Sequence, residues 1–223
     1  MGRARRERTG PRPLTDIARG RAASALPRLM LVTDRLDTGG RDLVDVVEAA
    51  VAGGVRLVQV RERDLSEAEV EALLGRLLAR LRGTDARLVV NGRPALARAL
   101  GIGLHLPAAG AFPDRPPALT GRSIHGEGEA RRAVAEGVSY VIAGPIFPTA
   151  SKPGHPGAGL AFLEELGRIV EPTPVFAIGG LTPERVAFLR AAGAHGVAVR
   201  SAILGAPDPA AAARAFIEAL TAI

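Results

Sequence analysis

The sequence predicts a single (β/α)8 TIM barrel, an α/β fold, over residues 28–223. From Leu29 onward, short and nearly continuous apolar runs follow one another, as expected for strands that are covered on both faces. Helical patterns separate most of these runs, and a length of 223 residues suits one barrel domain. An open doubly wound sheet is the alternative, but no G-x-G-x-x-G pattern follows the first strand.

The apolar runs predict eight strands, the number that a closed parallel barrel needs. In chain order they are Leu29–Thr33, Leu57–Val60, Leu88–Val90, Gly103–Leu106, Arg122–Ile124, Tyr140–Ala143, Val175–Ile178 and Val197–Val199.

Helical spacing of apolar residues and capping signals predict the connecting helices. Ser66 and Glu69 form a capping box before a leucine-rich stripe that runs to Leu81. Thr182 and Asp208 each stand before a proline, as at the start of a helix. The segment 108–119 is rich in proline and only weakly helical. Further helical stripes lie at 43–50, 96–100, 129–136 and 160–166.

Composition excludes several classes of protein. Hydrophobic residues make up 47% of the chain and aromatic residues only 3%, so the core is aliphatic. The absence of cysteine excludes disulfides, zinc–thiolate sites and a cysteine nucleophile. No apolar run reaches the roughly 20 residues of a membrane span, and residues 1–28 lack an apolar signal core. We therefore expect a cytoplasmic protein without a membrane partner.

The net charge of +6 comes from the N-terminus alone. Residues 1–28 carry eight arginines against Glu7 and Asp16, whereas acidic and basic residues balance in the rest of the chain. The Arg-rich segment has no hydrophobic periodicity, so we interpret residues 1–27 as a disordered, dispensable extension. A nucleic-acid-binding arm is the alternative, and we expect no nucleic acid partner.

Polar residues just past the strands of such a barrel face the active site. Two groups follow from this rule. Substrate-binding residues are expected at Gln59, Arg61, Arg63, Asn91, Ser123, Thr149 and Ser151. Phosphate-binding residues are expected at Gly179, Gly180, Arg200 and Ser201, because glycine amides after strand seven can approach an anion closely. A plain turn at the glycine pair is the alternative.

Two residues are candidates for catalysis. His125 follows strand five, and its ordinary pKa of about 6.5 suits proton transfer near neutrality. Lys152 is the only lysine among 29 basic residues and lies in a Gly/Pro-rich loop, where its charge could hold a carboxylate or phosphate. A structural histidine and an incidental surface lysine are the alternatives. His105, inside strand four, is more typical of a structural residue.

These residues resemble the thiamine phosphate synthase/TenI superfamily over about residues 28–220. The resemblance rests on motifs that occur in order at barrel spacing. They are Val32-Thr33-Asp34, Val58-Gln59-Val60-Arg61-Glu62-Arg63, Asn91-Gly92-Arg93, Gly103-Leu104-His105-Leu106, Gly144-Pro145-Ile146-Phe147-Pro148-Thr149 with Ser151-Lys152, and Ala177-Ile178-Gly179-Gly180.

The resemblance implies one of two main reactions. The synthase couples a pyrimidine diphosphate to thiazole phosphate with Mg²⁺, whereas TenI-type tautomerase isomerises carboxythiazole phosphate without metal. Gly92 and Gly110 stand where the synthase pattern has metal-binding aspartates. Mg²⁺ is usually held by one or two carboxylates besides substrate phosphates, so the resemblance favours a tautomerase with no cofactor and no metal site.

A thiamine phosphate synthase using Mg²⁺ is the first alternative, and a non-catalytic regulator that binds thiazole phosphate is the second. The Gly144–Lys152 loop is synthase-like and serves either ligand. The expected partner is a small phosphorylated thiazole, and we expect a homo-oligomer whose size the sequence does not define.

Overall fold

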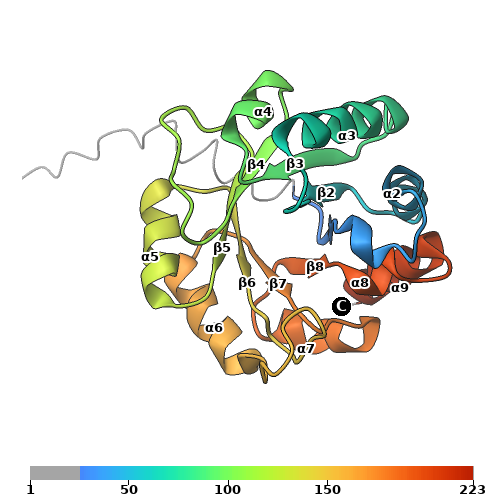
Figure 1. The fold of residues 1–223 in the computed structure, drawn as a ribbon. Helices are drawn as coiled ribbons and strands as arrows, with labels where there is room; N and C mark the ends of the chain where they lie inside the picture. The colour runs from blue at the N-terminus through green and yellow to red at the C-terminus, as the bar shows by residue number, and fades with distance from the viewer. Residues whose placement is uncertain (1–25, 223) are drawn as a thin grey trace, which may run out of the picture.

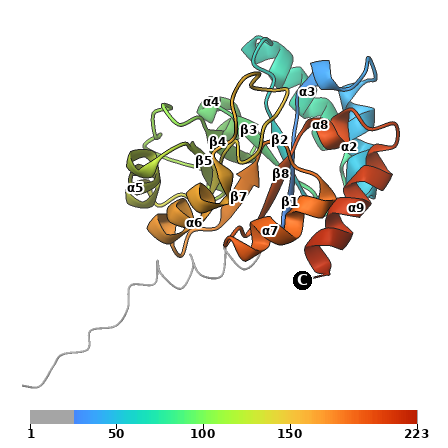
Figure 2. The ribbon, with the colours of Figure 1, turned by 90° about the horizontal axis from the view of Figure 1, so that it is seen from below.

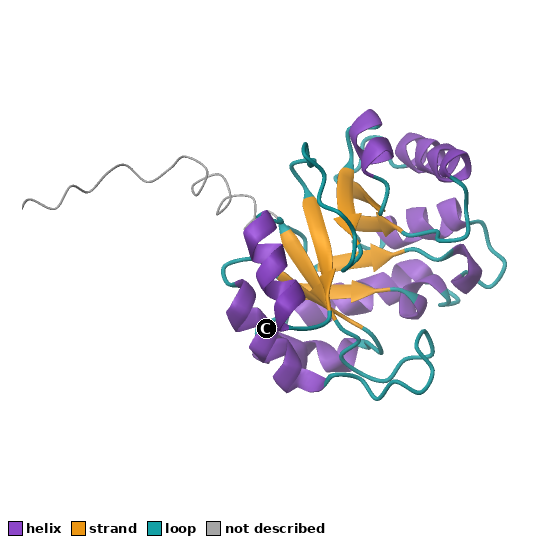
Figure 3. Cartoon of the chain, turned by 60° about the vertical axis from the view of Figure 1, so that its left-hand side comes forward, coloured by secondary structure: helices purple, strands orange, loops and turns teal. Residues whose placement is uncertain are grey.

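A computed structural model describes residues 26–222, which form a closed barrel of eight strands. Each strand runs parallel to the next, and β8 pairs with β1, so that Leu31 lies opposite both Val58 and Val199. Figure 3 shows the strands inside and the helices outside. This arrangement confirms the predicted barrel rather than an open sheet. The strands are β1 (Leu29–Val32), β2 (Leu57–Val60), β3 (Arg87–Asn91), β4 (Gly103–Leu106), β5 (Thr120–Ile124), β6 (Tyr140–Ala143), β7 (Val175–Ile178) and β8 (Gly196–Val199).

Helices surround the sheet on its outer face (Figure 1). Helix α9 packs against α2, which brings the end of the described chain beside its beginning (Figure 2). No helix joins β4 to β5 in this part of the chain, as the proline-rich sequence of residues 108–119 predicts. The helices are η1 (Arg35–Asp37), α2 (Leu43–Ala52), α3 (Glu67–Arg80), α4 (Pro94–Ala99), α5 (Glu127–Glu136), α6 (Gly159–Val170), η2 (Pro183–Arg185), α7 (Val186–Ala191), α8 (Ser201–Leu204) and α9 (Pro209–Thr221).

Two of the predicted helix caps form as expected. Ser66 and Glu69 make the reciprocal capping box at the start of α3. The Asp208 carboxylate accepts a hydrogen bond from the Ala211 amide, 2.9 Å away, at the start of α9. Thr182 precedes η2, but its side chain makes no cap hydrogen bond there. The sequence therefore locates all three starts, and the side-chain cap forms at two of them.

The core has two layers, one between sheet and helices and one inside the barrel. Inside, ring contacts run from His105 through Tyr140 and Phe176 to His195, with centroids 5.4–5.7 Å apart. Gly121 is needed beside them, because a Cβ atom there would lie 2.1 Å from the Tyr140 ring. This aromatic row fills the barrel interior beneath the upper rim.

The barrel begins earlier in the chain than the sequence predicts. Leu26 is buried in the inner core, and its carbonyl oxygen lies 3.1 Å from His195 Nε2. The predicted extension at 1–27 therefore includes at least two residues of the packed structure, because one apolar side chain before Arg28 is too short a signal to recognise. Residues 1–25, on which the rest of that prediction falls, lie outside the described residues.

Candidate active site

A pocket of about 350 Å³ opens at the carboxyl ends of the strands. Its floor is apolar and comes from the barrel interior, through Val32, Ile142, Ile178 and Ala198. Its rim comes from the loops that follow the strands, as is usual for this fold. Every residue that the sequence predicts for the site lies in this lining: Gln59, Arg61, Arg63, Asn91, Ser123, His125, Thr149, Ser151, Lys152, Gly179, Gly180, Arg200 and Ser201. The fold brings these residues together, and their individual roles stay predictions.

The charged side chains of the pocket are all basic. Arg61, Arg63, Lys152 and Arg200 line it, and among the described residues no Asp or Glu does so. Burial, followed by the positive charges of Arg63 and Arg200, lowers the pKa of Arg61 below its usual value. Such mutual repulsion between cations favours a bound anion, and more than one negative charge could be held here.

Arg200 ties three loops together at one side of the pocket. Its guanidinium lies 3.1 Å from the Asp34 carboxylate and 2.8 Å from that of Asp37, both in the segment after β1. It also donates a hydrogen bond to Ser151 Oγ, 2.8 Å away, in the loop after β6. Part of its hydrogen-bonding capacity is therefore used within the protein. Arg200 holds the rim in place in addition to the predicted phosphate contact.

The glycine pair after β7 adopts backbone angles that other residues rarely reach. Gly179 and Gly180 have φ angles of 102° and 63°. A Cβ atom on Gly180 would lie 2.3 Å from the carbonyl oxygen of Pro148, in the loop after β6. These glycines are thus required for loop packing, in addition to the access that they are predicted to give an anion. A side chain at Gly180 would disturb the loop itself, so substitution there cannot isolate a phosphate contact.

His125 has a carboxylate partner that the sequence analysis does not identify. The ring Nδ1 lies 3.1 Å from Glu129 Oε2, and the same oxygen accepts the His125 backbone N–H at 2.6 Å. The ring is about half exposed, with 45% of its side-chain surface accessible. If Nδ1 carries the ring proton and donates a hydrogen bond to Glu129, Nε2 is unprotonated and can act as the base. Glu129 follows His125 by four residues, a spacing that could have indicated this pair.

His105, in contrast, lies inside the barrel. Its Nδ1 lies 3.2 Å from the Tyr140 hydroxyl and its Nε2 lies 2.9 Å from Ser123 Oγ. Burial, with smaller contributions from the charges of Arg122 and Arg61, lowers its pKa to about 3. A histidine with so low a pKa is a weak base, which makes it a poor acid–base catalyst near neutral pH. The structural interpretation of His105 is therefore favoured, and it fixes the hydroxyl of Ser123 at the pocket.

The burial of His105 predicts a pH-dependent stability. Its pKa is near 3 when folded and about 6.5 when unfolded, so between these values the unfolded chain binds the extra proton. The contribution of neutral His105 to the free energy of unfolding is complete above pH 6.5. It is lost as the pH falls, by up to about 1.4 kcal/mol per pH unit. Urea unfolding at pH 7.5 and 5.5 should show this loss in the free energy of unfolding. His105→Asn should make the free energy of unfolding depend less steeply on pH. A slope unchanged in the variant would contradict the assignment.

The donor set of the pocket does not fit Mg²⁺. Gly92 and Gly110 have no side chain to offer, and no group of three or more His, Asp or Glu suited to a metal occurs within residues 26–222. The nearby carboxylates of Asp34 and Asp37 are paired with Arg200. Glu62 accepts hydrogen bonds from Thr33 Oγ1 at 2.6 Å and from a backbone amide at 2.9 Å. Together with the surrounding cations, these pairings leave the pocket without the carboxylates that usually hold this ion.

Comparison with known proteins gives a consistent family. The sequence matches the family described as thiamine monophosphate synthase over residues 29–203. A putative thiamine-phosphate synthase of Geobacter sulfurreducens is 45% identical over 208 residues, covering 86% of this chain and 93% of that protein. The thiamine-phosphate synthase of Thermus thermophilus is 38% identical over 196 residues, covering 86% of this chain and 95% of that protein.

A solved structure agrees with the sequence relatives. Thiamine phosphate pyrophosphorylase from Pyrococcus furiosus superposes with a TM-score of 0.76 at 28% identity, covering 86% of this chain and 95% of that one. The names of these relatives point to the transferase alternative rather than to the isomerase that the sequence analysis favours. No helix within residues 26–222 has the length and apolar character needed to cross a bilayer. With the family match extending over most of the sequence, the chain belongs to the thiamine monophosphate synthase family.

Proposed function

We propose that this chain acts on a phosphorylated thiazole of thiamine biosynthesis and isomerises its carboxylated form to the aromatic tautomer. One observation carries the proposal: the pocket is lined by four cationic side chains and, among the described residues, by no carboxylate. A ligand with both a phosphate and a carboxylate matches this charge without a metal ion. The apolar floor suits a flat heterocyclic ring.

The reaction needs one proton removed and one proton returned. A base takes the proton from the ring carbon that bears the carboxylate, and the electron pair moves through the ring toward the exocyclic vinyl carbon. That carbon takes up a proton, and the ring becomes aromatic, so no atom is gained or lost. His125 at the rim, oriented by Glu129, is the group we assign to proton transfer. Lys152 would hold the carboxylate and stabilise the electron-rich intermediate.

Thiamine phosphate synthase is the second candidate function, favoured by the names of relatives at 38–45% identity. In that reaction a metal ion would neutralise the diphosphate leaving group. The described residues that line the pocket include no Asp or Glu that could hold the metal. The pocket thus supports the isomerase, whereas the comparisons by themselves favour the transferase.

We expect the purified protein to convert carboxythiazole phosphate at the same rate with and without excess chelator. No metal enters the proposed reaction, because cationic side chains neutralise both anions. The measurement is the absorbance of the aromatic thiazole, beside a parallel assay that supplies pyrimidine diphosphate, thiazole phosphate and Mg²⁺. Product in the second assay alone would establish the transferase. Tight binding of thiazole phosphate with turnover in neither assay would identify a regulator.

A further inference from the structure

The pocket wall between β4 and β5 is a turn where the other connections of the barrel often have a helix. Pro107 and Ala108 line the pocket from this turn. The Gly110 amide donates a hydrogen bond to the Pro107 carbonyl, 2.8 Å away, which closes residues 107–110 into one tight unit. Helices stabilise their own carbonyl groups by internal hydrogen bonds, but a turn of this kind needs an external donor. The carbonyl groups of residues 107–110 therefore need a donor from elsewhere in the fold.

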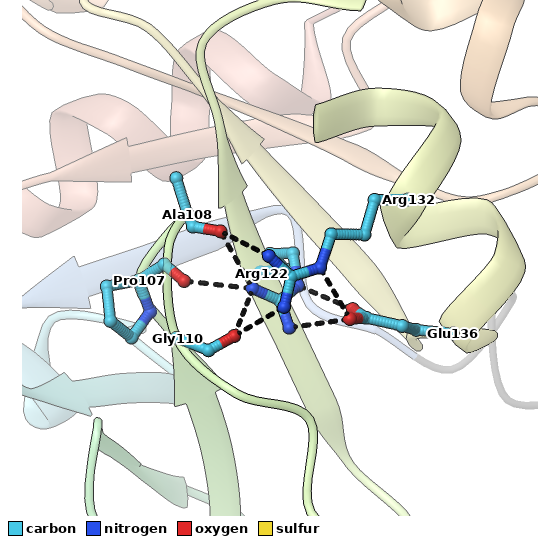
Figure 4. Close-up of polar contacts among 6 residues, drawn as sticks. All are labelled: Pro107, Ala108, Gly110, Arg122, Arg132 and Glu136. Carbon is cyan, nitrogen blue, oxygen red and sulfur yellow. Dashed lines mark hydrogen bonds and ion pairs between the residues drawn. The ribbon is translucent and has the colours of Figure 1, made fainter. Parts of the chain in front are cut away.

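That donor is Arg122, a residue of β5 that points to the outside of the barrel (Figure 4). Its side chain is fully buried. The Nη1 group donates to the carbonyl oxygens of Pro107, Ala108 and Gly110 at 2.9–3.0 Å. Nε and Nη2 donate to the two oxygens of Glu136, at the end of α5, at 2.6 and 3.0 Å.

Only arginine meets all of these requirements at once. Its planar guanidinium offers five N–H donors in a fixed fork, two edges of which here face the carboxylate and the turn. The bidentate pair with Glu136 compensates the buried positive charge. A lysine ammonium at the same position could contact the carboxylate or one carbonyl, but it could not span both partners.

We propose that Arg122 is a positioning residue that sets the shape of the pocket wall formed by Pro107 and Ala108. By holding the three carbonyl groups, it turns them toward itself and presents Pro107 and Ala108 to the ligand. The turn contains Gly110, and the Pro107 ring lies 3.9 Å from the Cβ position of Gly92. The two glycines at the family's metal-ligand positions are thus in or beside the wall that Arg122 holds. This inference rests on the proposed thiazole ligand.

The matched control is Arg132, which shares Glu136, Ala108 and Gly110 with Arg122 but is exposed. It donates to Glu136 Oε1 at 2.9 Å and to the Gly110 carbonyl at 2.8 Å. Its side chain keeps 42% of its surface accessible, whereas that of Arg122 is completely covered. Exposed pairs of this kind contribute little, so we expect Arg132→Ala to leave ligand binding nearly unchanged.

The experiment compares the dissociation constants of thiazole phosphate and of inorganic phosphate by calorimetry, with thermal unfolding in parallel. We expect Arg122→Lys to weaken thiazole phosphate by about tenfold, equivalent to ~1.4 kcal/mol. Inorganic phosphate, which lacks the ring that would contact Pro107 and Ala108, should stay within about twofold. Arg122→Met combined with Glu136→Leu removes both members of the buried pair, a replacement by hydrophobic residues that is often neutral for stability, and should give the same split.

Two results would overturn the positioning role. One is binding of thiazole phosphate within about twofold of wild type in both variants. The other is an equal loss for thiazole phosphate and inorganic phosphate, which would indicate a general structural defect. Failure of the wild-type protein to bind thiazole phosphate while it binds phosphate would refute the proposed function, and this inference with it.

Discussion

Replacement of His125 by alanine is expected to lower kcat for the isomerisation by about 10²–10⁴-fold, the usual value of a positioned acid–base group. The ring lines the pocket and is held through Nδ1 by Glu129. Removing it leaves the cationic residues and the glycine-rich end in place. Binding of the aromatic product should therefore change little, because the phosphate contacts are predicted elsewhere in the pocket, at Gly180 and Ser201.

The rate of aromatic thiazole formation measures this prediction, with product affinity determined alongside. His155→Ala is the matched control, since His155 lies in the loop after β6 but is not part of the pocket lining. Glu129→Gln tests the orientation of the ring: it should lower kcat less than His125→Ala and shift the pH profile. A His125→Ala enzyme within about threefold of wild type, against a minimum of 10²-fold for acid–base loss, would assign proton transfer to another residue.

The barrel could be predicted from sequence because its strands are buried on both faces. Such strands are short apolar runs that stand out from the amphipathic helices between them. All eight are present, with ends that differ by at most two residues from the prediction. The start of the domain was harder to predict from the sequence, because Leu26 is a single apolar residue after an arginine-rich segment. Only its contact with the inner core reveals its role.

The composition of the site was also predictable, but its internal contacts were not. The rule that residues at or past the carboxyl end of each strand face one pocket locates Gln59 as well as Lys152, although they are far apart in the chain. The same rule cannot identify Arg122, which is on β5 but points away from the pocket toward a turn and a helix end. Likewise, the structural role of His105 depends on its burial and on its contact with Tyr140, two strands away.

The names of the relatives and the charge of the pocket point to different reactions. The names of the relatives rest on similarity over most of the chain, at 38–45% identity with 86% of it covered. By resemblance to the synthase pattern, the carboxylates expected to hold Mg²⁺ for coupling occupy only two positions. Gly92 and Gly110 are both such positions, so high overall identity is compatible with a changed reaction.

Replacement of Lys152 by methionine is the second change with a large expected effect. With carboxythiazole phosphate bound, the ammonium would face the carboxylate next to the carbon that loses its proton. Negative charge builds up there in the transition state, and loss of one group that stabilises such charge typically costs about 10²–10³ in kcat. We expect a loss of about 10²-fold, near the lower limit, because the side chain is exposed and water screens part of its charge.

The charge, rather than the length of the side chain, should decide the effect. Lys152→Arg keeps the charge and should lose less than about tenfold. Thiazole phosphate without the carboxylate provides an internal control, since its affinity should be the same within about twofold in wild type and Lys152→Met. Equal loss of affinity for the two ligands would mean that Lys152 binds the phosphate instead. In that case the carboxylate must lie against Arg61, Arg63 or Arg200, the other cations of the pocket, and His125 would have to act at a different ring position.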